Sequence, residues 1–205
     1  IECADADYQA KNIVFEKSYT VYDLYYDGNK LGQVELIVPG RHNVLNSLGA
    51  LAAAFELGIS FDKAVASMKL FSGAKRRFET KGHVDGVWIV DDYAHHPTEI
   101  KATLAAAKQT RPNRLMCIFQ PHRYTRTQLL LEEFGGAFGD CDELILTEIY
   151  SAGEQPIPDI CGKKLCDEVT KQTAQKVVYI PELCDIEEYL KKNVKTGDLV
   201  ITLGA

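Results

Sequence analysis

The fold of this chain is decided by Val87-Trp88-Ile89-Val90-Asp91-Asp92-Tyr93-Ala94-His95-His96-Pro97-Thr98-Glu99. The run begins with four apolar residues, and a short apolar run that ends in polar residues predicts a buried strand. Pro97 suits the first turn of a helix, because its fixed φ is helical and its missing N–H would have no partner there. We expect this helix to end near Gln109. A strand that leads through a polar loop into a helix is the repeating unit of an α/β sheet.

The same alternation continues to the end of the sequence. A hairpin of strands Phe78–Thr80 and Val87–Asp91, turning at Asp85-Gly86, comes first. The elements expected after the helix are strand Arg114–Phe119, a helical stretch Arg126–Phe138, strand Glu143–Leu146, helix Gly162–Lys171, strand Val177–Tyr179, helix Ile186–Asn193 and strand Leu199–Leu203. This order predicts a mostly parallel sheet with right-handed crossovers. Ligands of such sheets bind at the carboxyl ends of the strands.

Residues 1–72 have a different pattern. Three strands are expected at Asn12–Glu16, Thr20–Tyr26 and Gln33–Val38, with a hairpin turn at Asp27–Lys30. Helical spacing follows at Asn43–Leu57 and Phe61–Leu70. Phe71-Ser72-Gly73-Ala74 is then interpreted as a hinge between domains. We therefore expect two domains, at 1–72 and 73–205.

Composition limits the classes of function. The net charge of −6 argues against nucleic acid as a partner, because phosphate-backbone binding needs clustered Lys and Arg. No apolar run reaches the roughly 18 residues of a membrane span. The sequence opens on Ile1-Glu2 without a signal peptide, and this abrupt start is interpreted as a fragment of a longer cytoplasmic protein. The cysteines have no C-x-x-C spacing and are expected to be buried free thiols: Cys3, Cys117, Cys141, Cys161, Cys166 and Cys184.

Polar clusters stand where strands are expected to end. Pro39–Asn46 passes from a strand into a helix, and the free N–H groups of a helix start suit a nucleotide phosphate. A helix cap by Asn43 would explain that residue alone. Lys75-Arg76-Arg77 is either a solvated surface or the source of an arginine that reaches a transferring phosphate.

The loop Asp91–Glu99 is interpreted as a site that orients polar ligands. His95 and His96 are neighbours and do not easily converge on one metal ion, unlike ligands four residues apart on a helix. A metal-dependent hydrolase that uses His95, His96 and His122 is carried as an alternative function. The sequence has no phosphate loop and no dinucleotide-binding glycine motif, so it does not support a self-sufficient nucleotide-hydrolysing enzyme.

The segment Phe119–Thr127 follows the next strand and holds two arginines three residues apart. If helical, Arg123 and Arg126 share a face and can grip a carboxylate together. The alternative is a solvated helix start. Tyr150–Glu154 forms a further polar loop that carries little information alone.

Five stretches, in this order, make the chain similar to the Mur ligase family: PGRHNVLNSLGALAAA at 39–54, FSGAKRRFE at 71–79, DDYAHHPTEI at 91–100, FQPHRYTRT at 119–127 and YSAGEQPI at 150–157. The resemblance implies a three-domain ligase. Residues 1–72 would end its central ATPase domain, and 73–205 would form its Rossmann-like C-terminal domain, clipped after Ala205. The phosphate loop and most ligands of Mg²⁺ would then lie upstream.

The activity implied by the resemblance is peptidoglycan precursor synthesis. ATP, with Mg²⁺, would convert the carboxylate of UDP-N-acetylmuramate into an acyl phosphate, which the amine of L-alanine then attacks. The stretch at 119–127 favours alanine-adding members over the ligase that recycles murein tripeptide. A non-catalytic nucleotide-binding domain of the same fold is the other alternative. The fragment alone is expected to be inactive and to bind nucleotide weakly.

The resemblance also implies roles for individual residues. The positions matched to nucleotide contacts are His42, Asn43 and Asn46 at adenine, Arg77 at the phosphates, and Asp92 and Tyr93 at the ribose. Those matched to the incoming amino acid are His95, Arg123 and Arg126, with the two arginines pairing its carboxylate. Ala94 stands where many relatives carry Gly, a change that is not expected to remove function.

Overall fold

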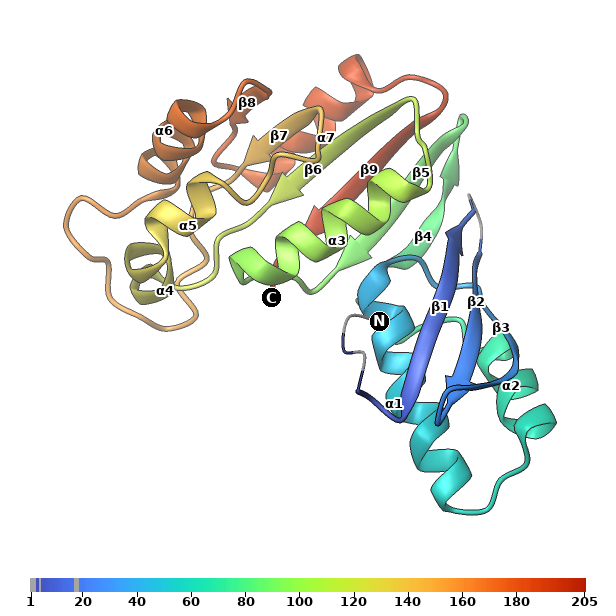
Figure 1. The fold of residues 1–205 in the computed structure, drawn as a ribbon. Coiled ribbons are helices and arrows are strands. Elements are labelled where there is room, and N and C mark those ends of the chain that lie inside the picture. The colour runs from blue at the N-terminus through green and yellow to red at the C-terminus, as the bar shows by residue number, and fades with distance from the viewer. Residues whose placement is uncertain (1–2, 4, 17–18) are drawn as a thin grey trace. The chain divides into compact units, whose positions relative to one another are not determined.

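A computed structural model describes residue 3, residues 5–16 and residues 19–205; the sequence start at Ile1-Glu2 lies outside them. The chain divides into two compact units (Figure 1). The first ends at Gly73 and includes Gln109–Arg111, whereas the second comprises Ala74–Lys108 and Pro112–Ala205. In the part of the chain so described, no helix is both long and apolar enough to cross a membrane.

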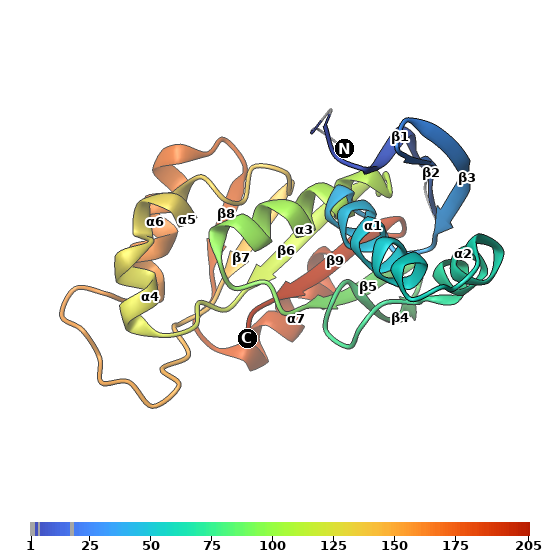
Figure 2. The same cartoon turned by 60° about the horizontal axis from the view of Figure 1, so that its bottom comes forward.

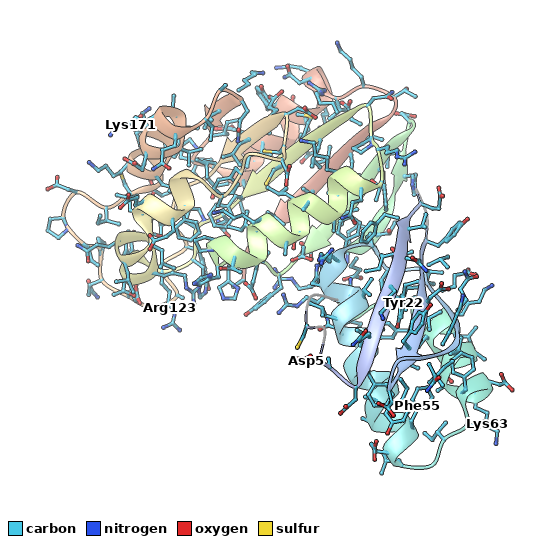
Figure 3. The ribbon with its side chains drawn as sticks, viewed as in Figure 1. Asp5, Tyr22, Phe55, Lys63, Arg123 and Lys171 are labelled. Atoms are coloured by element: carbon cyan, nitrogen blue, oxygen red, sulfur yellow. The ribbon has the colours of Figure 1, made fainter. Side chains whose placement is uncertain are left out.

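The first unit packs two helices on a three-stranded antiparallel sheet. Its elements are β1 (Tyr8–Phe15), β2 (Thr20–Tyr26), β3 (Asn29–Leu36), α1 (Arg41–Glu56) and α2 (Phe61–Leu70). Tyr22, labelled on β2 in Figure 3, is fully buried, and its hydroxyl lies 2.8 Å from that of Ser47 on α1. The expected hairpin turn is present but shorter than Asp27–Lys30: Asp27 and Gly28 form it, with φ of 45° and 75°. Positive φ at both positions suits a two-residue hairpin.

The second unit is built on a six-stranded sheet. Its strands are β4 (Glu79–Val84), β5 (Val87–Asp92), β6 (Arg114–Phe119), β7 (Glu143–Leu146), β8 (Lys176–Tyr179) and β9 (Asp198–Leu203). Their order is β4-β5-β9-β6-β7-β8, and only β4 is antiparallel to its neighbour. The expected α/β fold with a mostly parallel sheet is confirmed.

Helices cover both faces of this sheet (Figures 1 and 2). They are α3 (Pro97–Gln109), α4 (Tyr124–Leu129), α5 (Leu131–Gly135), α6 (Gly162–Gln172) and α7 (Leu183–Asn193). Leu115 and Cys117 join the core beneath α3, α5 and α6, whereas Met116 and Ile118 join the core beneath α7. This division follows from the strand, because successive side chains point to opposite faces.

Two expectations, one about a helix of the second unit and one about the cysteines, were wrong. The helical stretch 126–138 is two short helices separated at Leu130, whose φ of −110° lies outside the helical range. The cysteines are all free, but Cys3 and Cys184 are exposed rather than buried. Cys184 lies in the first turn of α7, a helix whose buried face is centred on Ile186.

Candidate functional site

The polar loops of the second unit begin side by side. The last residues of β5, β9 and β6 are paired in register, Asp92 with Leu203 and Leu203 with Phe119. Phe119 is in turn paired with Leu146 at the end of β7. The loops after β5, β6 and β7 therefore leave one edge of the sheet, where α/β domains bind their ligands.

A row of aromatic rings crosses this edge and joins the three loops. The rings of Tyr93 and His95 meet edge to face with centroids 5.2 Å apart. The His95 and His122 centroids are 6.4 Å apart, and His122 stacks on Tyr150 at 5.6 Å. A parallel bridge between His122 and Tyr150 ties the loop after β6 to the loop after β7. Side chains that are 57 residues apart in sequence thus share one surface.

The hydrogen bonds of the two histidines define their neutral tautomers. His95 Nδ1 lies 2.9 Å from the carbonyl oxygen of Tyr93, which only accepts, so Nδ1 carries the proton and Nε2 the lone pair. His122 Nδ1 lies 3.3 Å from Arg126 Nη1, which only donates, so here Nδ1 carries the lone pair. Burial, followed by the charges of Arg126 and Arg123, lowers the pKa of His122. The two rings therefore present opposite hydrogen-bonding character at Nε2.

The two arginines of the loop after β6 are both present at the site, but they do not share a helix. Arg123 precedes α4 and has a φ of 74°, so the condition under which the two arginines would share one helical face is not met. Its N–H donates to the carbonyl of Tyr150 at 2.9 Å, a contact that holds this uncommon conformation. Figure 3 labels Arg123 beside α4.

Glu154 fastens the loop after β7 to the start of α4. Its carboxylate accepts from the Thr125 hydroxyl at 2.6 Å and from the Thr125 N–H at 3.0 Å. These hydrogen bonds lower the pKa of Glu154. Its Oε1 also lies 4.0 Å from Arg123 Nη1, so a negative charge stands beside this arginine.

The basic segment after the unit boundary is partly fixed. Arg76 Nη2 donates to the carbonyl of Gly204 at 2.7 Å, and its Nε donates to Asp91 at 3.3 Å. Its guanidinium carbon lies 4.8 Å from the centroid of the Tyr93 ring, and that of Arg77 lies 5.6 Å away. Arg76 is therefore not simply a solvated surface residue. The side chain of Arg77 is 51% exposed.

Asp92 is the most enclosed of the predicted site residues, with only 4% of its surface exposed. Its two oxygens accept the N–H groups of Phe78 and Ala94, each at 2.8 Å. Burial raises the pKa of Asp92, although these N–H groups act in the opposite direction. Its carboxylate thus fixes, through hydrogen bonds to the backbone, the loop that contains Tyr93.

Glu99 ends the loop that was predicted as a ligand site, but no individual role was predicted for it. Its Oε1 lies 3.5 Å from Arg77 Nη1, and its Oε2 accepts the N–H groups of His95 at 3.1 Å and His96 at 3.3 Å. The signal in the sequence was its place in the first helical turn, where a carboxylate commonly accepts free backbone N–H groups.

The remaining predicted residues lie in the first unit, on the first two turns of α1. The helix begins after Gly40, so Asn43 is not its cap; instead, Asn43 Nδ2 donates to the carbonyl of Pro39 at 2.7 Å. Asn46 Nδ2 donates to Asn43 Oδ1 at 3.4 Å. His42 is half-buried beside them. These three residues thus belong to the first unit. The six other predicted site residues belong to the second unit: Arg77, Asp92, Tyr93, His95, Arg123 and Arg126.

Metal binding was the alternative carried for the histidines. Within residues 3, 5–16 and 19–205, no three His, Cys, Asp or Glu side chains gather as a metal site. His96 Nδ1 accepts the N–H of Thr98 at 3.3 Å, and this contact directs it to the start of α3.

A mostly parallel sheet with helices on both faces defines a Rossmann-like domain. A sequence profile described as "Mur ligase, glutamate ligase domain" matches residues 76–205. The chain belongs to the Mur ligase family, which confirms the resemblance seen in its sequence.

Individual relatives agree with this assignment. UDP-N-acetylmuramate–L-alanine ligases of Pelotomaculum thermopropionicum and Syntrophus aciditrophicus are 46% and 50% identical over 201 and 200 residues. Each match covers 98% of this chain but only 44% and 42% of those proteins. The crystal structure of UDP-N-acetylmuramate-alanine ligase MurC from Thermotoga maritima superposes with a TM-score of 0.84 at 26% identity, covering 99% of this chain and 43% of that one. This chain thus spans less than half the length of these relatives.

A more distant structure shares the fold alone. MurF ligase from Thermotoga maritima, solved in complex with ADP, superposes with a TM-score of 0.72 at 18% identity, covering 98% of this chain and 44% of that one.

Proposed function

We propose that this chain is part of a longer ATP-dependent ligase that joins L-alanine to the carboxylate of UDP-N-acetylmuramate, a step of peptidoglycan precursor synthesis in the cytoplasm. The relatives are named as UDP-N-acetylmuramate–L-alanine ligases, which supports this choice of substrates. The observation that carries the proposal is the contact of Arg126 with His122, a ring that lies beside His95 and within the electrostatic influence of Arg123, at the carboxyl end of the sheet.

The proposed chemistry forms the amide through an acyl phosphate. ATP, with Mg²⁺, supplies the phosphoryl group that activates the muramyl carboxylate, and ADP leaves. The amine of L-alanine attacks the activated carbonyl, and the tetrahedral intermediate releases phosphate as the amide forms. The described residues fit the nucleotide through Arg77 and Tyr93, whereas we assign Mg²⁺ mainly to residues outside this chain.

The amino-acid subsite is assigned to the loops after β5 and β6. The guanidinium groups of Arg123 and Arg126 would bind the carboxylate of L-alanine, because arginine pairs with carboxylates in a defined geometry. His95 would face the amine. A small zwitterion held at both ends has its attacking nitrogen oriented, and orientation of this kind can lower the barrier by about 7–11 kcal/mol.

Residues of each unit are assigned separate roles in nucleotide binding. We propose that residues 1–72 end the central ATP-binding domain, with His42, Asn43 and Asn46 at the adenine, and that 73–205 form the C-terminal domain. Arg77 would contact the phosphates, and Asp92 and Tyr93 would lie at the ribose. A half-exposed guanidinium near an aromatic ring is suited to a nucleotide phosphate.

Steady-state kinetics of the full-length protein test this function. ADP should form only when UDP-N-acetylmuramate and L-alanine are both supplied. Arg126→Ala should raise the KM for L-alanine about 10- to 100-fold and that for ATP much less, because a charge-assisted hydrogen bond contributes about 1.5–3 kcal/mol. Lys171→Ala, a cation on α6 that Figure 3 shows well away from Arg123, is the control.

Three outcomes would contradict the proposal. An unchanged alanine KM in Arg126→Ala would remove the carboxylate assignment. Faster ligation of murein tripeptide than of L-alanine would identify the recycling ligase instead. Ligase activity of residues 1–205 alone would contradict the proposal that the phosphate loop lies elsewhere in a longer protein.

A further inference from the structure

Glu99 lies between Arg77 and His95, which are assigned to the nucleotide and to the amino acid respectively. It occupies the third position of α3, and each of its oxygens serves a different partner. Oε1 lies 3.5 Å from Nη1 of Arg77, whereas Oε2 accepts the N–H groups of His95 and His96 and lies 3.6 Å from His95 Nδ1. One carboxylate therefore touches a residue assigned to the nucleotide phosphates and a residue assigned to the amino acid.

The surroundings of Glu99 favour the negatively charged form of its carboxylate. Partial burial opposes ionisation, but the N–H of His95, the His95 ring, the N–H of His96 and Arg77 together lower the pKa of Glu99. Its side chain is 35% exposed, so these interactions are only partly screened by water. The carboxylate is therefore ionised at neutral pH, with Arg77 as its neighbouring cation.

Arg77 is the partner that a nucleotide can remove. Arg76 is held by Gly204 and Asp91, whereas Arg77 forms an ion pair with Glu99 alone among the described residues, and its side chain is 51% exposed. A polyphosphate carries more charge than one carboxylate and competes for this guanidinium. Once Arg77 turns to a phosphate, the charge of Glu99 is no longer balanced by it.

We propose that Glu99 is a positioning residue that couples nucleotide binding to amino-acid binding. Released from Arg77, its carboxylate holds the His95–His96 backbone more strongly and attracts the α-ammonium group of the incoming amino acid. Nucleotide binding therefore tightens the amino-acid site. By thermodynamic linkage the amino acid must tighten nucleotide binding by the same factor. This inference rests on the proposed function, because it needs both subsites.

Calorimetry on the full-length protein tests the coupling. The dissociation constant of L-alanine is measured with UDP-N-acetylmuramate present, with and without a non-hydrolysable ATP analogue. We expect about fivefold tighter binding with the analogue in the wild type, at the low end of ordinary coupling factors. Glu99→Gln keeps an oxygen for the backbone N–H groups but removes the charge, and it should reduce this factor to less than about twofold.

Two further variants separate coupling from folding. Arg77→Ala should also abolish the factor, and adding Glu99→Gln to it should change nothing more, because both act on one interaction. Glu133→Gln makes the same carboxylate-to-amide change in the first turn of α5 and should keep the wild-type factor. An undiminished factor in Glu99→Gln overturns the inference.

Different results would contradict the coupling role of Glu99 and the proposed function. The wild-type protein could ligate L-alanine while its dissociation constant for L-alanine is unchanged by the ATP analogue. In that case the coupling role of Glu99 is wrong and the proposed function stands. If the wild-type protein shows no ATP-dependent use of L-alanine, the proposed function is wrong and the inference falls with it.

Discussion

His122 Nδ1 accepts a hydrogen bond from Arg126 Nη1 over 3.3 Å, within a single loop and helix start after β6. The contact requires a neutral ring, since a protonated Nδ1 would meet the guanidinium with a hydrogen and a like charge. The neutral state of His122 and the orientation of Arg126 are thus linked, and this relationship has a measurable pH dependence.

The first prediction concerns acid stability. The pKa of His122 is lowered from 6.5 by burial and by Arg126 and Arg123. Below about pH 6.5 the unfolded chain therefore binds a proton that the folded chain resists, so stability falls as the pH drops from there toward the folded pKa. Thermal unfolding of His122→Asn, whose amide oxygen can still accept from Arg126, should show a smaller loss between pH 7.5 and 5.5. Parallel curves for the two proteins would contradict this.

Asp92 should be essential to the loop after β5. Because its two oxygens accept from Phe78 and Ala94, Asp92→Asn leaves one buried N–H facing an amide NH₂. We expect the free energy of unfolding in urea to fall by about 1–3 kcal/mol. Asp140→Asn, which loses only an exposed pair with Lys108, should fall by less than about 1 kcal/mol. Equal effects would show that burial of Asp92 has no energetic consequence.

Gly162 is required by close packing at the start of α6. A Cβ atom there would lie 2.2 Å from the backbone oxygen of Thr147, and the Gly162 N–H donates to Glu148 at 2.6 Å. Gly162→Ala should therefore destabilise the protein by about 1–3 kcal/mol in urea unfolding. Gly139→Ala has open space at the corresponding position and is the control, expected within about 0.5 kcal/mol of wild type.

Arg114 joins three strands at the opposite edge of the sheet. Its guanidinium lies 2.5 Å from Asp198 and 3.4 Å from Glu143, carboxylates whose side chains are only 3% and 4% exposed. Arg114→Ala should cost about 3 kcal/mol, because two buried charges lose a partner. The exposed pair of Lys163 and Asp167 is the comparison, and Lys163→Ala should cost less than about 1 kcal/mol. A similar cost for both would mean that the buried network is not stabilising.

Local pattern was enough to predict many elements. The strands Arg114–Phe119 and Glu143–Leu146 and the helices Phe61–Leu70 and Pro97–Gln109 have the expected bounds. Each is bounded by residues that end a strand or start a helix, and each shows its own apolar period. Element ends that depend on a partner strand were less predictable: β1 begins at Tyr8, four residues early, because Tyr8 pairs with Tyr26.

The sequence by itself determined that this chain is an α/β protein of the Mur ligase family with polar loops after its strands, because those properties are written in residue type and spacing. Only the tertiary structure decided that β9 lies between β5 and β6, that Arg123 lies outside α4, and that Glu99 contacts both Arg77 and His95. These features depend on strand pairing and on contacts between distant residues, such as the bond from Arg123 N–H to the carbonyl of Tyr150. No local propensity encodes such a bond, because its energy is gained only once the two loops have been brought together.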